Sequence, residues 1–462
     1  MARPHSAWLA GIVVLGLALR LAPLLSNWSH PDLFMVDDDS WDYHRIATNL
    51  LAGHGYSLDQ RPPYEPDVYR PAGLPCVLAV VYSCGGGSIP LAILLQVAAS
   101  SGLIVLTYRL ARGLGFGPQH ASGAALFVAV DPLSIAQSNL LLTEVYSSLV
   151  ILGTGCLVVE YFRTLNRAWL LAAGGLIGVG ILIHPILLFA PIFLVALPLF
   201  DPRTRTRGNL AYAALAGVVA LVPATAWIAR NSVAADYRGL SCVAAINLLK
   251  YKAAGVEADL RGTSREVERD RLVAECAAVL PEGATPGAKY RLWQAKAVSV
   301  LLAHPLVYAK IHACGMAVQL LGPGRDNLTR LVYGRRILDA GGRVTEAGFE
   351  AGRQAEPSPV RAALLRLALC VQIFTSLLVL AGVVRLLVKR EWRLLAALVL
   401  PAAYVLALSG GPESEPRFRT IYMPLVCLLA AAGTPALGSL AKALRRVFTR
   451  HQTTARPVVA AG

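Results

Sequence analysis

Long apolar runs recur along this chain and are separated by short polar segments. A helix needs about 20 apolar residues to cross a bilayer whose hydrocarbon core is about 30 Å thick. Windows of that length predict an all-α polytopic membrane protein with about ten spans, within a range of roughly 9 to 12. The expected spans lie near residues 7–25, 88–108, 119–135, 145–162, 168–184, 186–200, 208–228, 364–384, 394–409 and 418–440.

Two apolar runs need separate treatment. Residues 72–84 (PAGLPCVLAVVYS) are too few to cross a bilayer, so we expect a helix that lies at its interface. The first run has the composition of a signal peptide, but no small-residue cleavage site of the usual kind precedes Ser26. We therefore expect it to be a retained anchor.

The distribution of charge predicts the orientation of these spans. The formal net charge is +15, and 55% of the 462 residues are apolar. Lys and Arg gather in short segments near 109–112, 163–167, 203–207, 385–393 and 442–450, which is the pattern that orients spans and gives no reason to expect nucleic acid. Both termini are then cytoplasmic, and the acidic loop 26–71 faces outward.

The chain is expected to divide into four parts. These are a transmembrane module with its acidic loop (1–228), an outer, periplasmic segment with amphipathic helices (229–363), C-terminal spans (364–441) and a basic cytoplasmic tail (442–462). One helix is expected over 287–321, and the basic loops after it argue that 298–321 do not cross. Cys242 and Cys276 would be free to pair in an oxidising compartment.

The first outer loop holds an acidic cluster, VDDDSWDYHR at 36–45, directly after an apolar run. Apolar positions at three- and four-residue spacings predict a short helix over 40–52, which begins at the aspartates. Asp39 with Asp42 resembles a capping box, which would stabilise the helix without any catalysis. A carboxylate at this helix start is equally well placed to take a proton from an acceptor hydroxyl. The residues alone leave both interpretations open.

Five segments in order resemble landmarks of one enzyme family: DSWDYHRIATNLLAGHGYS at 39–57, YRPAGLP at 69–75, the segment 132–144 ending LLTE, WIARN at 227–231 and EPRFRTIYMP at 415–424. They are similar to polyprenyl-phosphate-sugar-dependent glycosyltransferases with the GT-C fold, which include the protein O-mannosyltransferase and lipid A aminoarabinose transferase types. The resemblance covers most of the chain. It implies a GT-C-type transmembrane bundle with interfacial helices and a small outer domain.

The resemblance also implies a mechanism. Such enzymes take a sugar from an undecaprenyl, decaprenyl or dolichyl phosphate carrier, invert its anomeric centre, and use an aspartate of the first outer loop as general base. The family places that acid four residues before a tyrosine, which here selects Asp39 before Tyr43. The commoner family pattern is Asp-Glu where this chain has Asp39 and Ser40, so Asp38 is the alternative carboxylate.

The departing lipid phosphate gains negative charge and needs cationic donors near the membrane. Arg70 in YRPAGLP matches a family basic residue that contacts donor phosphate, although Asp67 or Glu65 could instead hold it as a loop arginine. Arg417 and Arg419 in EPRFR begin a span, where they either bind the donor or anchor the helix by snorkelling. We expect at least one of the pair to bind the donor.

Tyr43, Glu144 and Arg230 are further candidates for binding the donor phosphate or the substrate, and Glu144 and His184 are candidates for binding a metal. Glu144 ends the second outer segment, and its role would be to bind a metal or to brace Arg70 or Arg230 of WIARN. His184 precedes Pro185, where relatives often have Arg-Pro, and an imidazole there is either structural or a metal ligand. Metal dependence varies in the family, so a divalent ion is left open as a cofactor.

The expected partners are a polyprenyl-phosphate sugar donor, a lipid, glycan or protein acceptor, and membrane lipids. The expected place is the bacterial cytoplasmic membrane, with the active site facing the periplasm. Two other classes fit a polytopic basic chain. A transporter or flippase would show charges or broken helices near span centres. A ligase or polymerase acting on lipid-diphosphate donors would carry its long outer loop late in the chain.

Overall fold

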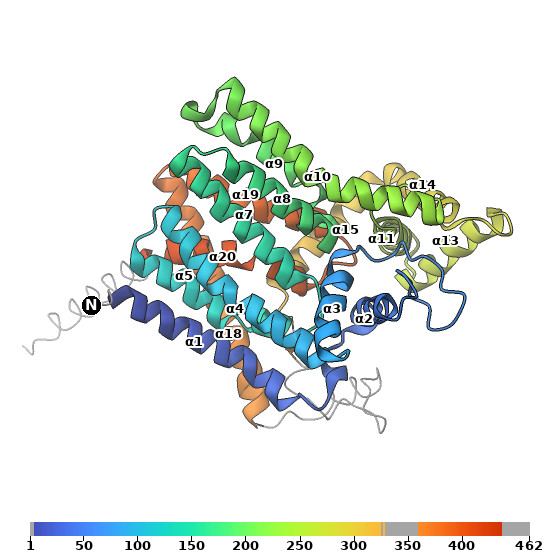
Figure 1. The fold of residues 1–462 in the computed structure, drawn as a ribbon, viewed down its shortest axis with the longest axis horizontal. Coiled ribbons are helices and arrows are strands. Elements are labelled where there is room, and N and C mark those ends of the chain that lie inside the picture. The colour runs from blue at the N-terminus through green and yellow to red at the C-terminus, as the bar shows by residue number, and fades with distance from the viewer. Residues whose placement is uncertain (1–3, 325–326, 329–358, 437–462) are drawn as a thin grey trace, which may run out of the picture.

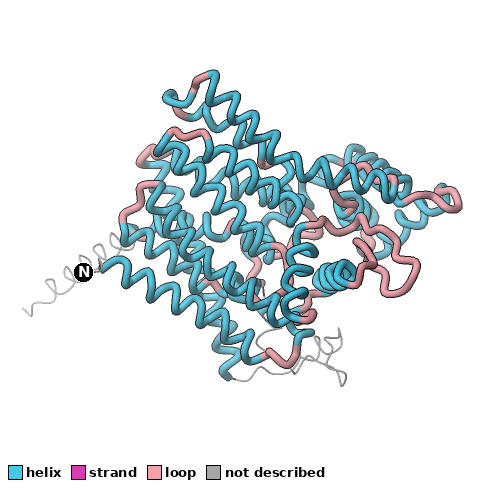
Figure 2. The backbone as a smooth tube through the Cα atoms, in the orientation of Figure 1, coloured by secondary structure: helices cyan, strands magenta, loops and turns pink. Residues whose placement is uncertain are grey.

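The computed structural model describes residues 4–324, 327–328 and 359–436. These residues form helices joined by loops, and no strand occurs among them (Figures 1 and 2). The long apolar helices lie side by side on the left of Figure 1, and the helices of the polar segment that follows residue 235 lie on the right. The expected basic tail, 442–462, falls outside the described residues.

The transmembrane bundle is built from neighbouring apolar helices. Helix α4 packs against α1, α5 and α7, α8 packs against α7 and α10, and α20 packs against α18 and α5. The bounds are α1 (Pro4–Ser26), α4 (Ile89–Gly113), α5 (Pro118–Val130), α7 (Glu144–Thr164), α8 (Ala168–Ile183), α10 (Arg207–Ala235), α18 (Pro359–Val388), α19 (Trp392–Ser409) and α20 (Met423–Gly433).

Six described helices are long and apolar enough to cross a membrane, or seven if one bent pair counts as a span. The expected count of about ten is therefore not confirmed. Proline accounts for much of the difference, because it removes a backbone donor and ends a helix. Pro191 and Pro198 break the run after His184 into η2 (Pro185–Phe189), α9 (Pro191–Ala196) and η3 (Leu197–Phe200), and Pro132 follows the end of α5.

The segment that the sequence predicts to lie outside the membrane, called the outer segment below and described here over residues 236–321, folds into short helices around its own core. Leu249, Leu272 and Trp293 are buried together there. Its elements are α11 (Val243–Ile246), the π-helical turn η5 (Asn247–Ala253), α12 (Ala254–Arg261), α13 (Arg265–Val279), α14 (Pro286–Ala303) and α15 (Pro305–Leu321).

The expected single helix over 287–321 is wrong, because α14 and α15 meet at a bend of 102°. His304 between them has φ −131° and ψ 57°, outside the helical region, and Pro305 starts the second helix. Cys242 and Cys276 are buried in this segment as free cysteines, in two different apolar clusters. The disulfide that the sequence allowed between them is not formed.

Two helices lie beside the outer segment and pack against each other, α2 (Asp37–Leu51) and α3 (Gly73–Gly85). Helix α3 is the short helix expected over 72–84. The remaining described elements are short connections, namely η1 (Pro31–Phe34), α6 (Pro132–Gln137), η4 (Pro202–Thr204) and η7 (Pro416–Ile421).

One arginine lies deep among the apolar helices. Arg20 of α1 is fully buried, and its guanidinium donates to Ser100 Oγ at 2.8 Å, to Val128 O at 2.9 Å and to Ala129 O at 3.0 Å. The two carbonyl groups belong to the last turn of α5, where helix geometry leaves carbonyls without a partner. Arg20 therefore satisfies the end of α5 and ties it to α1 and α4.

Candidate active site

Helix α2 begins at Asp37, three residues before the start expected from the sequence. Its N-cap is Val36, and no side-chain capping hydrogen bond is formed there. The Val36 backbone N–H donates to Ser40 Oγ at 2.8 Å, and not to an aspartate. Asp39 therefore lies inside the first turn, and the capping interpretation of Asp39 is wrong. The side chain of Asp38 is outside the described part of the chain.

Asp39 makes two ion pairs, one from each carboxylate oxygen. Its Oδ1 lies 2.8 Å from Arg70 Nη2, and its Oδ2 lies 2.9 Å from Arg417 Nη2. The two arginines come from the loop before α3 and from η7, and are 347 positions apart in the sequence. Helix α2 thus presents one carboxylate to two guanidiniums from distant segments.

Arg70 is fixed from several directions. Its Nε and Nη2 donate to Asp42 Oδ2 at 3.0 and 2.8 Å. Its guanidinium carbon lies 4.1 Å from the Tyr69 ring centroid and 5.2 Å from that of Tyr43. The Asp67 carboxylate accepts from the backbone N–H groups of Tyr69, at 3.0 Å, and Arg70, at 2.9 Å, and not from the Arg70 guanidinium, so the alternative in which Asp67 or Glu65 holds this side chain is wrong.

Arg417 is 9% exposed and lies among three carboxylates. Besides Asp39, its Nε lies 2.9 Å from Glu415 Oε2 and 3.6 Å from Glu144 Oε1. Glu144, at the start of α7, is 3% exposed, and its Oε2 has no hydrogen-bond partner in the described structure. Glu144 therefore faces Arg417, rather than bracing Arg70 or Arg230 as the sequence suggested.

We call this group the ionic cluster. It consists of Asp39, Asp42, Arg70, Glu144, Glu415 and Arg417. Four carboxylates face the guanidiniums of Arg70 and Arg417, and Arg45 at the edge lies 3.7 Å from Asp42 Oδ1, so the acids still outnumber the arginines when every group is ionised. Exposure differs among the acids: the Asp39 side chain is 31% exposed, compared with 9% for Asp42 and 3% for Glu144.

The arginines also set the protonation of Asp39. Burial alone would raise its pKa, but the charges of Arg417 and Arg70 outweigh burial and hold the pKa below its ordinary value. In return the surrounding carboxylates, acting against burial, raise the pKa of both arginines. Burial raises the pKa of Tyr43, which therefore stays neutral. Asp39 is a carboxylate at any ordinary pH.

Two predicted site arginines lie outside the ionic cluster. Arg230 of α10 donates to the carbonyl of Asp67 and, at 3.3 Å, to that of Tyr56, and its guanidinium lies 5.0 Å from the Trp227 ring centroid. Arg230 therefore holds the backbone of the loop between α2 and α3 at two points. Arg419 donates to the carbonyls of Leu320 and Gly322 at 2.7 and 3.2 Å, at the end of α15, where it caps that helix.

His184 follows α8 and begins η2, where its Nδ1 accepts from the Ile186 backbone N–H at 3.2 Å. This is the structural role that the sequence left open. The expected metal ligands are Glu144 and His184, yet the described residues contain no group of three or more His, Cys, Asp or Glu able to hold a metal ion. A metal site at these two residues is therefore not supported by the described side chains.

Sequence reasoning missed two members of the cluster as site residues. Asp42 lies three positions after Asp39, on the same face of α2, and that spacing was a usable signal. Glu415 is two positions before Arg417 in a turn, where no periodicity predicts which way a side chain points.

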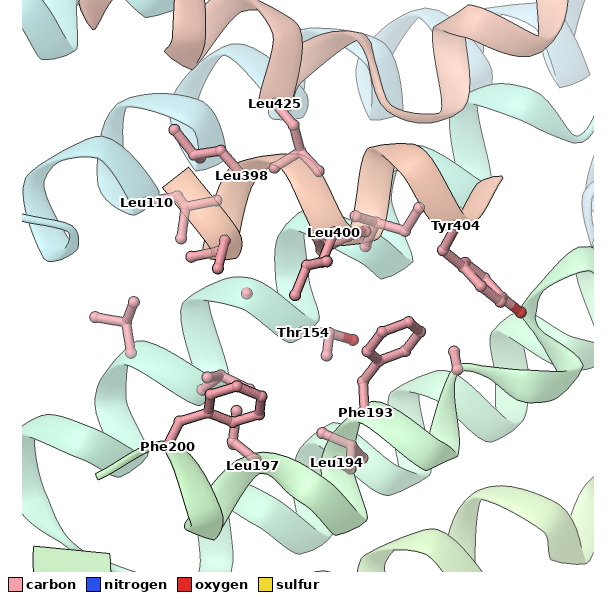
Figure 3. Close-up of a pocket in the computed structure, with 18 of the residues that line it drawn as sticks. Leu110, Thr154, Phe193, Leu194, Leu197, Phe200, Leu398, Leu400, Tyr404 and Leu425 are labelled. Carbon is pink, nitrogen blue, oxygen red and sulfur yellow. The ribbon is translucent and has the colours of Figure 1, made fainter. Parts of the chain in front are cut away.

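An apolar cavity of about 460 Å³ lies within the bundle, between α7, α9 and α19 (Figure 3). Phe193 and Phe200 line one side of it and Leu398 the other, with Tyr404 at one end. The Tyr404 hydroxyl donates to the carbonyl of Ile186, two residues after His184. The cavity therefore approaches the segment that carries His184.

Comparisons with known proteins bear on the fold. A family model described as dolichyl-phosphate-mannose-protein mannosyltransferase matches residues 88–237. No curated protein matches the sequence. The solved oligosaccharyltransferase of Archaeoglobus fulgidus, tethered to an acceptor peptide with the NVT sequon, superposes with a TM-score of 0.51 and 14% identity over 99% of this chain.

This chain spans 52% of that oligosaccharyltransferase. ArnT from Cupriavidus metallidurans has a TM-score of 0.40 in two states. Its apo structure is 17% identical and covers 92% of this chain and 77% of its own. Its complex with undecaprenyl phosphate is 15% identical and covers 94% and 79%. The helical architecture, the family model and the likeness to the oligosaccharyltransferase together show that this chain has the GT-C fold of polytopic membrane glycosyltransferases.

Proposed function

We propose that this protein transfers a sugar from a polyprenyl monophosphate carrier to a hydroxyl group of an acceptor, at the outer face of a bacterial cytoplasmic membrane. In this proposal Asp39 is the general base, and Arg70 and Arg417 bind the donor phosphate. The observation that carries it is the ion pairing of both Asp39 oxygens, at 2.8 and 2.9 Å, with two arginines from distant segments.

The chemistry assigns one role to each charge. Asp39 takes the proton of the acceptor hydroxyl, whose oxygen attacks the anomeric carbon. The bond from that carbon to the phosphate oxygen breaks, and its electron pair leaves with the polyprenyl phosphate. A single displacement of this kind inverts the anomeric centre. Asp39 is better exposed than Asp42 or Glu144, and unlike the more exposed Glu415 it pairs with both arginines, which favours it as the acid that meets the acceptor.

The arginines suit the leaving phosphate. A guanidinium offers five N–H donors in a planar fork that matches phosphate, and it holds its charge under all ordinary conditions. The Asp39 carboxylate pairs with one N–H group of each guanidinium. A donor phosphate would compete with that carboxylate for the same two arginines, while Asp42 and Glu415 hold them in place.

This competition links donor binding to the strength of the base. While both arginines pair with Asp39, its pKa is low and it attracts a proton weakly. A phosphate that draws the guanidiniums toward itself supplies negative charge beside Asp39 and removes part of that stabilisation, so the pKa of Asp39 rises. The base then gains strength only when the sugar donor is bound.

The apolar cavity supports a lipid-linked donor. Val150, which lines it, is six residues after Glu144 on α7, or about 9 Å along the helix axis at 1.5 Å per residue. A phosphate at Arg417 would therefore lie within a short reach of an apolar space of about 460 Å³. We assign this space to the part of the polyprenyl chain nearest the phosphate.

Binding of undecaprenyl phosphate to the purified protein in lipid nanodiscs tests the proposal. Arg417→Gln should weaken binding by about one to two decades, which corresponds to a charge-assisted contact of about 1.5–3 kcal/mol. Arg163→Gln is the matched control, because its side chain is 71% exposed and pairs with Glu160 away from the cluster. Equal affinity in Arg417→Gln and wild type would refute the phosphate site.

A further inference from the structure

The turn between α19 and η7, residues 410–416, is held by the outer segment. This turn leads into Arg417. Lys252 Nζ donates to the carbonyl of Gly410 at 2.7 Å, and Arg265 Nη1 donates to that of Pro412 at 3.0 Å. Two cations of the outer segment therefore bind the backbone of the turn that carries the proposed phosphate ligand.

Lys252 makes a second contact that involves charge. Its Nζ lies 3.1 Å from Glu413 Oε1, and the side chains of Lys252 and Glu413 are 10% and 12% exposed. Lysine and glutamate are rarely so deeply buried unless they are paired. Lys252 lies in the π-helical turn η5, a rare element that is frequently found at functional sites.

The turn has little room to move against α15. Gly411 has φ +130°, and a Cβ built there would lie 3.1 Å from Lys252 Nζ and 2.5 Å from Glu413 Oε2. A Cβ at Gly315 of α15 would lie 2.0 Å from the carbonyl oxygen of Gly411. Only glycine fits at either position, so the backbone of the turn and the helix are in direct contact.

We infer that Lys252 is a positioning residue for Arg417: by holding Gly410 and Glu413, it fixes the turn that places the guanidinium beside Asp39. Arg417 is four positions after Glu413, and Glu415 between them pairs with Arg417 at 2.9 Å. The inference rests on the proposed function, because its readout is the phosphate affinity that Arg417 is proposed to supply.

Loss of Lys252 should release this end of the turn. Glu413 would be left as a buried carboxylate without its cation, and burial already raises its pKa against the charge of Lys252. The carboxylate would then take up a proton or turn toward water, and either change loosens the turn. The outer segment would no longer set the position of Arg417.

The test compares undecaprenyl phosphate binding and thermal stability of the full-length protein in nanodiscs. Lys252→Met keeps the length of the apolar stem and removes the charge. We expect about tenfold weaker binding, because a displaced Arg417 guanidinium loses part of its charge-assisted contact with the phosphate. Lys252→Arg should recover most of the affinity. Lys310→Met is the matched control, because Lys310 of α15 is 62% exposed, pairs with Asp259 at 2.7 Å, and should not affect binding.

A double-mutant cycle separates positioning from a general structural role. In the Arg417→Gln background, Lys252→Met should cause no further loss of affinity, because the group that it positions is gone. An equal tenfold loss in both backgrounds would overturn the inference. If Lys252→Met does not fold, Glu413→Gln replaces it in the cycle, with a smaller loss expected in the same direction.

Failure of the inference can be told apart from failure of the proposed function. If Arg417→Gln binds the lipid phosphate as well as wild type does, the phosphate site itself is wrong. If Arg417→Gln weakens binding while both Lys252→Met and Glu413→Gln leave it unchanged, the phosphate site stands and the positioning role of Lys252 is wrong.

Discussion

Replacing Asp39 with asparagine separates its two proposed roles, as the base and as the competitor for the arginines. Asparagine keeps the shape of the side chain but cannot take the acceptor proton. General base catalysis contributes about 100- to 10,000-fold, so turnover should fall by at least about 100-fold, or ~2.7 kcal/mol in the barrier. Arg70 and Arg417 keep Asp42 and Glu415 as partners, so loss of the Asp39 charge should lower the melting temperature only modestly at neutral pH.

Donor affinity should change in the opposite direction. A unit charge about 5 Å from a phosphate interacts with each phosphate charge by about 3 kcal/mol at an effective dielectric constant of about 20. The Asp39 side chain is 31% exposed, so water screens this repulsion, as the cluster's arginines do. We expect roughly tenfold tighter binding of undecaprenyl phosphate, or ~1.4 kcal/mol, once the competing carboxylate is neutral.

The assay pairs single-turnover sugar transfer with equilibrium binding, both in nanodiscs. Asp259→Asn is the control, because its side chain is 35% exposed and ion-paired at 2.7 Å, much like Asp39, but lies in the outer segment. Wild-type turnover in Asp39→Asn would exclude it as the base. Weaker lipid-phosphate binding in that variant would refute the competition between Asp39 and the phosphate.

Four further predictions concern the arginines, the pKa of Asp39 and the orientation of the chain in the membrane. Arg70→Lys should weaken lipid-phosphate binding and Arg70→Ala should weaken it by about one to two decades, since lysine cannot form the two parallel bonds of a guanidinium; equal binding by all three proteins would contradict the role. The lowered pKa of Asp39 stabilises the fold at any pH above its unfolded value of about 4, and this contribution is lost as pH falls through the folded value, so wild type and Asp39→Asn should converge in melting temperature at low pH. Arg417→Gln should move the acid limb of kcat/KM to higher pH, and an unmoved limb would argue against Asp39 as the titrating base. In a variant whose exposed cysteines are replaced by serine, an impermeant thiol reagent should label Gln60→Cys in intact cells and leave Arg205→Cys unlabelled, and the reverse pattern would invert the topology.

The fold class could be predicted from the sequence because apolar length and basic loops are properties of local composition. The number of spans could not. The mean hydropathy of a window of about 20 residues hardly depends on whether prolines interrupt the helix. Pro191 and Pro198 divide the apolar run after His184 into three short helical pieces. The bend at His304 was likewise hidden, since the apolar pattern continues through it while the backbone turns by 102°.

The candidate site divides in the same way. The family-like motifs drew attention to Asp39, Arg70 and Arg417, and the structure brings these three within ion-pair distance. Arg419 lies only two residues from Arg417 in the same motif but caps α15, because the short helical turn η7 points the two side chains in different directions. Lys252 carries no sequence signal, since its importance depends on a turn 158 residues away.

Arg20 has a consequence for biogenesis. A charged side chain near the middle of a lone helix opposes membrane insertion by about 2.5–3.5 kcal/mol on insertion scales. Arg20 donates to one carbonyl of its own helix, that of Gly16, at 3.0 Å. Its other described partners, Ser100, Val128 and Ala129, lie in α4 and α5, which are made about 80 to 110 residues later. Until α4 and α5 have been synthesised and inserted, we expect α1 either to stay at the translocation machinery or to lie in lipid with the Arg20 guanidinium extended toward the interface. We expect N-terminal fragments that end before α5 to be degraded quickly in cells, and fragments that include α5 to persist.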